Sequence, residues 1–209
     1  MPVHTLEVGA LGTCCHILTA AGQRECIVVD PGGDAPVILR ALRKMDATPT
    51  HILVTHSHYD HIAAVDELLE AFPAALCAAH PLCAERMDDP EANLSAWIGD
   101  PQVVARPLQV LTDGECIACG AISLVARHTP GHEPGHMIFI NATECYAIVG
   151  DLVFAGSVGR TDFPGCSPAA LRKSIRDVIL TLPDDMVLYP GHGPSTTVGA
   201  ERHDNPFFS

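Results

Sequence analysis

The segment Thr55-His56-Ser57-His58-Tyr59-Asp60-His61 constrains this 209-residue chain more than any other stretch. It holds four potential metal ligands within six residues, directly after the apolar run 52–54 and before a helical pattern. It is therefore expected where a buried strand ends and a helix begins. Imidazole and carboxylate groups suit a borderline divalent metal, and alternate residues leaving an extended segment can converge on one ion. The segment therefore offers one pair of ligands, His56 and His58, for one ion and a second pair, Asp60 and His61, for another.

A lone histidine is usually a surface residue or a satisfied core residue, and the chain has 12 histidines. The pattern His-x-His-x-Asp-His, however, arises by chance in only about 3 of 1,000 sequences of this composition. The segment is therefore interpreted as a metal site.

Three later strand ends deliver candidate ligands of the same kinds. The predicted strand 122–126 leads into a tight Gly/Pro loop that carries His132, the strand 146–149 ends at Asp151, and the strand 186–189 runs into His192. Clustering of such residues at strand ends is what the rim of an active site requires. The predicted metal ligands are His56, His58, Asp60, His61, His132, Asp151 and His192, with Asp60 and Asp151 also expected to be catalytic.

Five histidines and two aspartates can fill two metal coordination spheres and leave a place for water. A carboxylate can bridge two cations, and water held between them loses a proton near neutral pH, since a metal-bound water reaches a pKa near ~7. The resulting hydroxide is a nucleophile, so no Ser or Cys nucleophile is needed. Two divalent ions per chain are expected, zinc first, although Fe(II) or Mn also suit these ligands.

The apolar periodicity predicts strands that alternate with helices in both halves of the chain. Such a pattern favours an α/β sandwich over an all-β barrel. Segment 81–99 is expected to be irregular or weakly helical, and 152–164 to be a flexible polar loop. Asp30 is expected to be a turn residue or, slightly favoured, a partner of a ligand histidine. The other expected elements are strands 3–8, 13–19, 26–29, 50–54 and 74–79, and helices 34–45, capped by Asp34, 62–72, and 168–182, capped by Ser167.

Composition narrows the class of protein. Hydrophobic residues make up 47% of the chain and charged residues 18%, which is typical of a globular protein. The net charge of −13 argues against nucleic acid or an anionic membrane as the main partner. With no signal-peptide pattern and no apolar run near ~20 residues, a cytoplasmic protein is expected. The nine scattered cysteines fit a reducing compartment, and Cys116-Ile-Ala-Cys119 is interpreted as part of a hairpin.

The motifs also resemble those of a known family. Thr-His-Ser-His-Tyr-Asp-His, Thr-Pro-Gly-His at 129–132, Gly-Asp at 150–151 and Pro-Gly-His-Gly at 190–193 look like the ordered motifs of metallo-β-lactamase-fold hydrolases. The stretches 156–165 and 191–197, with Asn-Pro-Phe at 205–207, resemble the single-domain branch of glyoxalase-II-like proteins. The resemblance implies a four-layer αββα sandwich over 1–209, without the C-terminal helical domain that supplies much of the glutathione site in two-domain relatives.

The resemblance further implies how the ligands divide and what they do. His56, His58 and His132 would bind one metal, Asp60, His61 and His192 the second, and Asp151 would bridge them. The implied reaction is hydrolysis of S-D-lactoylglutathione to D-lactate and glutathione through a metal-bridging hydroxide. The partner that the resemblance implies is a small-molecule thioester derived from glutathione. Arg160 and Tyr146 are candidate substrate-binding residues, although a structural pair of Arg160 with Asp162 and a core role for Tyr146 are open alternatives.

The sequence leaves two alternative functions open. An iron persulfide dioxygenase shares the histidine motif and would use one Fe(II) held by His56, His132 and Asp151. A metal-stabilised regulatory protein without turnover belongs to a different class. The ending Gly-His-Gly-Pro-Ser-Thr-Thr at 191–197 favours the hydrolase. The sequence leaves the oligomeric state open.

Overall fold

The computed structural model describes residues 3–104 and 109–208. Its first six-stranded sheet has the order β1-β2-β3-β4-β5-β6. Strands β1 to β3 pair antiparallel, whereas β3 to β6 pair parallel, so the carboxyl ends of β3, β4 and β5 lie at one edge. The bounds are β1 Val3–Val8, β2 Thr13–Thr19, β3 Glu25–Val29, β4 Thr48–Leu53, β5 Leu76–Ala79 and β6 Gln109–Val110.

The second six-stranded sheet has the order β14-β13-β10-β9-β8-β7. Because β9 is antiparallel to both β8 and β10, and β13 is parallel to β10, the strands β8, β10 and β13 all point the same way. Cys116 and Cys119 lie on β7 of the β7–β8 hairpin, as predicted. The bounds are β7 Cys116–Cys119, β8 Ile122–His128, β9 Met137–Asn141, β10 Tyr146–Gly150, β13 Val187–Pro190 and β14 Thr196–Thr197.

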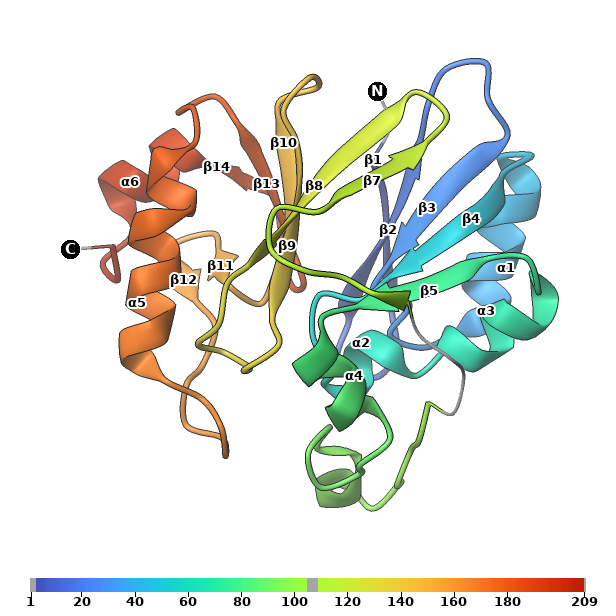
Figure 1. Cartoon of the computed structure of the whole chain (residues 1–209), viewed down its shortest axis with the longest axis horizontal. Coiled ribbons are helices and arrows are strands. Elements are labelled where there is room, and N and C mark those ends of the chain that lie inside the picture. The colour runs from blue at the N-terminus through green and yellow to red at the C-terminus, as the bar shows by residue number, and fades with distance from the viewer. Residues whose placement is uncertain (1–2, 105–108, 209) are drawn as a thin grey trace.

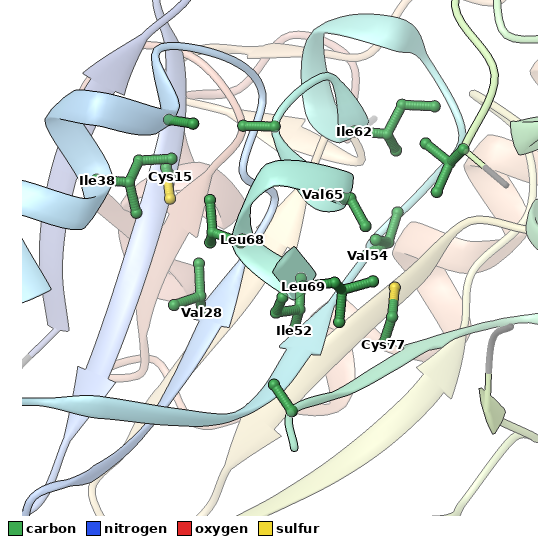
Figure 2. Packing of buried hydrophobic residues seen from close by; sticks show 14 of the residues in the cluster. Cys15, Val28, Ile38, Ile52, Val54, Ile62, Val65, Leu68, Leu69 and Cys77 are labelled. Carbon is green, nitrogen blue, oxygen red and sulfur yellow. The ribbon is translucent and has the colours of Figure 1, made fainter. Parts of the chain in front are cut away.

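Helices cover the outer face of each sheet, as Figure 1 shows. The first sheet packs on α1 and α3 through a buried cluster that includes Ile38 and Leu68 (Figure 2). A second cluster, around Phe139, fills the space between the sheets, and a third, around Ile175, lies between the second sheet and its helices α5 and α6. The predicted αββα sandwich is confirmed. The helices are α1 Ala35–Lys44, α2 Tyr59–Ile62, α3 Val65–Ala71, α4 Pro81–Met87, α5 Pro168–Asp177 and α6 Val198–Asp204.

Two segments are more regular than the sequence predicts. Segment 81–99, predicted to be irregular or weakly helical, contains the short 3₁₀ helix η1 (Ser95–Ile98) and the helix α4, in whose first turn Pro81 loses no hydrogen bond. Segment 152–164 contains the small hairpin of β11 (Val153–Phe154) and β12 (Ser157–Val158).

Of the two predicted helix caps, Ser167 forms the capping hydrogen bond and Asp34 does not. Ser167 caps α5 by accepting from the amide of Ala170 at 3.2 Å. Asp34 precedes α1 but adopts a left-handed backbone with φ 49°, and its carboxylate accepts from the amide of Gly9 instead. No helix in the described part of the chain is long and apolar enough to cross a membrane.

Candidate metal centre

Four strand ends meet at one edge of the sandwich and bring the predicted ligands together. After β4 the chain presents two histidines and then enters α2, while β8, β10 and β13 each lead into one further ligand. The side chains of the predicted ligands are buried, except that of His192, which is half-buried. The structure thus gathers His56, His58, Asp60, His61, His132, Asp151 and His192 into one cluster.

The first group is His56, His58 and His132, whose ring nitrogens face one point. His58 Nδ1 lies 3.1 Å from His56 Nε2 and 3.0 Å from His132 Nε2. The two Nε2 atoms lie 3.3 Å apart. These separations are close to those of nitrogens held about 2.1 Å from one tetrahedral ion.

Hydrogen bonds on the far side of two rings determine where their protons lie. His132 Nδ1 donates to the main-chain oxygen of Arg160 at 2.8 Å. His56 Nδ1 lies 3.0 Å from Thr55 Oγ1, which itself donates to Asp30 and so accepts from the ring. Both rings therefore aim an unprotonated Nε2 at the shared point. Lone pairs that face each other at such distances repel unless a cation lies between them, so this group fits a metal ion.

The second group is Asp60, His61 and His192. Asp60 Oδ2 lies 3.2 Å from His192 Nε2 and 3.6 Å from His61 Nε2, and it accepts from Thr13 Oγ1 at 2.8 Å. His61 donates through Nδ1 to Asp30, and its buried Nε2 has no hydrogen-bond partner among the described residues. A metal ion at this point would satisfy that nitrogen.

Asp151 faces both groups. Its Oδ1 lies 3.5 Å from His61 Nε2, and its Oδ2 lies 3.5 Å from His132 Nε2 and 3.8 Å from His192 Nε2. Close packing requires a glycine beside it, since a Cβ at Gly191 would overlap Asp151 Oδ1 and lie 2.6 Å from His61 Cε1. This arrangement suits a carboxylate that bridges two ions.

Burial and charge set the protonation of the ligands. Burial lowers the pKa of His56, His58 and His132, which keeps these rings in the neutral form that binds metals. Burial also lowers the pKa of His61, but Asp60 and the neighbouring carboxylates of Asp151 and Asp30 outweigh it and raise that pKa to about 10. The same negative field attracts a cation that competes with the proton for His61 Nε2.

Asp30 is the residue whose role the sequence defined least. Together with His56 and His61 it forms a third compact group of possible ligands. Its carboxylate, however, faces the protonated Nδ1 of His61 and accepts from the amide and hydroxyl of Thr55. We interpret Asp30 as the residue that orients His61, in agreement with the slightly favoured prediction.

A cavity of about 640 Å³ opens onto five of the ligands, and Arg160 also lines it. The guanidinium of Arg160 pairs with Asp162 through contacts of 2.6 and 2.7 Å and lies 4.0 Å from the ring centre of Phe163. Tyr146 does not reach this cavity. It lies at the start of β10, lines a separate cavity of about 350 Å³, and accepts at its hydroxyl from Asn141.

Comparison with known proteins agrees with this geometry. A model of the Metallo-beta-lactamase superfamily matches residues 9–192. The chain is 30% identical to the hydroxyacylglutathione hydrolase GloC of Haemophilus influenzae, over 100% of this chain and 99% of that protein.

Two solved structures also match nearly the whole chain. BLEG-1 B3 metallo-beta-lactamase matches with a TM-score of 0.95 and 34% identity over 100% of both chains. TTHA1623 in a di-iron-bound form matches with a TM-score of 0.88 and 33% identity, over 98% of this chain and 100% of that one. The chain belongs to the Metallo-beta-lactamase superfamily.

Proposed function

We propose that this metallo-hydrolase uses two divalent metal ions to hydrolyse a thioester, with S-D-lactoylglutathione as the first substrate to test. The observation that carries the proposal is the pair of ligand groups joined by Asp151, which faces nitrogens of both. Similarity to the hydroxyacylglutathione hydrolase GloC supports the choice of substrate.

Metal ions bound by these groups would supply Lewis acidity and lower the pKa of a water molecule toward ~7. Burial raises the pKa of Asp60, but His61 and hydrogen bonds from His192 and Thr13 outweigh it and hold that pKa well below its usual range. Asp60 is therefore a carboxylate at neutral pH. It can orient the attacking water by accepting a hydrogen bond from it. A thiolate, with a thiol pKa of about 8.5, leaves without a general acid.

The persulfide dioxygenase is the nearest competing function. It needs one iron held by His56, His132 and Asp151, and it gives no task to a second group. Asp60, His61 and His192 nevertheless converge, and His61 Nε2 is buried without a hydrogen-bond partner in the described structure. This second group can hold the second metal that the hydrolase needs, and the ending Gly-His-Gly-Pro-Ser-Thr-Thr at 191–197 favours the hydrolase over the dioxygenase.

Metal content and a substrate panel together test the proposal. The protein is purified without added metal, its metals are counted by elemental analysis, and release of thiol from several thioesters is measured. Two metals per chain with thioester cleavage is the expected result. One iron per chain, with oxygen consumption on glutathione persulfide, would establish the dioxygenase instead. Bound metal with neither reaction would favour the regulatory protein.

A further inference from the structure

The cleft beside the metal centre has an apolar wall, formed by Leu11, Leu94, Trp97, Ile98, Phe154 and Phe163. Three of these large side chains are more than half exposed: Leu11 at 55%, Trp97 at 57% and Ile98 at 52%. Exposed apolar side chains gathered around one cavity are typical of a ligand-binding groove.

Hydrogen bonds fix the part of the wall formed by η1 to the metal-binding segment. Buried Asn93 donates to the main-chain oxygens of Met87 and Gln102 at 3.1 and 2.9 Å and accepts from the amide of Ser95. Its own main-chain oxygen accepts from the amide of Tyr59, which lies between two ligands in the sequence. The next residue, Leu94, is held in a left-handed conformation with φ 70°. A preformed wall of this kind loses little entropy when a ligand binds.

Aromatic contacts continue the wall to the ligand histidines. The rings of Trp97 and Phe163 meet edge to face at 5.7 Å, and Phe163 lies 5.9 Å from His58. Phe154, which also belongs to the wall, lies 6.2 Å from the ligand His192. The ring of Phe163 thus links Trp97 to the ligand His58, so an acyl chain that extends from the metal centre along Phe163 can pack on Trp97.

Positive charge is scarce in the cleft. Among the described residues that line it, Arg160 is the only lysine or arginine, and its Nε and Nη2 groups already donate to Asp162. Apart from the metal ions of the proposed function, the two carboxylates of glutathione find little charge complement there, whereas a neutral apolar group finds a large surface. We propose, on the basis of the thioester hydrolase function, that the apolar wall binds a bulky alkyl or aromatic acyl group. Thioesters with such a group are then preferred over the small, polar lactoyl thioester.

Binding can be measured without turnover, because Trp97 is the only tryptophan of the chain. The metal-loaded protein is titrated with S-hexylglutathione and with S-methylglutathione, which are thioethers that cannot be hydrolysed. The hexyl compound should shift the Trp97 emission to the blue with a Kd at least ~10-fold below that of the methyl compound. Ile98→Ala should weaken hexyl binding by ~5-fold. The matched control is Leu76→Ala, which removes a side chain that is 50% exposed on β5, away from the cleft.

Turnover gives the second readout. The ratio of kcat/KM for S-hexanoylglutathione to that for S-D-lactoylglutathione should be at least ~10, and Ile98→Ala should lower this ratio. Equal binding of the two thioethers without an emission shift would overturn the inference, even if lactoylglutathione is hydrolysed. Hexyl binding with the shift, but no hydrolysis of any thioester, would support the wall and refute the proposed function. Trp97 emission that moves to the blue with protein concentration alone would show that a second copy covers the wall, which would also overturn the inference.

Discussion

The carboxylate of Asp30 accepts a hydrogen bond from Nδ1 of His61 at 2.9 Å, and both side chains are buried. Asp30 also accepts from the amide and hydroxyl of Thr55 at 2.7 and 2.6 Å. Its φ of 52° is left-handed, a conformation that aspartate and asparagine tolerate better than most residues. Asp30 therefore holds the His61 ring so that Nε2 faces Asp60 and Asp151.

Replacing Asp30 by asparagine tests this orienting role. Asparagine keeps the shape and the backbone conformation, but its amide group cannot accept all three hydrogen bonds. We expect the affinity of the second metal site to fall by ~10–100-fold, measured by competition with a chelator. Asp34→Asn is the control, because Asp34 is exposed and has a similar φ of 49°. Unchanged affinity in Asp30→Asn would refute the role.

Gly191→Ala tests the close packing at Asp151. The added methyl group would overlap Asp151 Oδ1 and crowd His61, so both side chains must shift. We expect metal content to fall while the far-ultraviolet circular dichroism stays that of the wild type. Gly199→Ala is the comparison, because the three atoms nearest to its Cβ all belong to Asp184, which is not a ligand. Wild-type metal content in Gly191→Ala would contradict the described packing.

His58→Ala separates a two-metal from a one-metal mechanism. The substitution removes one of three nitrogens of the first group, and we expect bound metal to fall to one per chain with a loss of activity of at least ~100-fold. His203→Ala, on the exposed surface of α6, controls for the loss of an imidazole. If His58→Ala kept full turnover, the two-metal mechanism would be wrong.

His80 provides a pH-dependent contribution to stability outside the metal centre. Burial, and then the ring of His128 stacked at 4.1 Å, lower the pKa of His80 from 6.5 to about 4. Between these values the unfolded state binds more protons than the folded state, so the free energy of unfolding falls as pH decreases from 6.5 toward 4. His80→Asn keeps an acceptor for the amide of Leu82 and should make this decline shallower in urea unfolding. An identical slope in both proteins would refute the assignment.

Much of the site could be predicted because ligand type and position are local properties of the sequence. Short apolar runs locate the ends of β4, β8, β10 and β13, and histidine or aspartate follows each of them. The strand directions then bring these ends to one edge of the sandwich.

The features that the sequence did not predict depend on the path of the chain in three dimensions. Tyr146 starts β10, five residues before Asp151, and a strand rises about 3.3 Å per residue, which places this tyrosine far from the metal centre. The apolar wall depends on the turn at Leu94 and on the hydrogen bonds of Asn93, for which no local pattern exists. The two-residue strands β11 and β12 are too short to show a periodicity.

Activity as a function of metal loading tests the central claim most directly. Protein stripped with a chelator is titrated with zinc while hydrolysis of S-D-lactoylglutathione and metal binding are followed together. The two ligand groups joined by Asp151 predict that activity reaches its maximum only at two equivalents of zinc per chain. Full activity at one equivalent, with no gain from the second, would contradict the two-metal hydrolase.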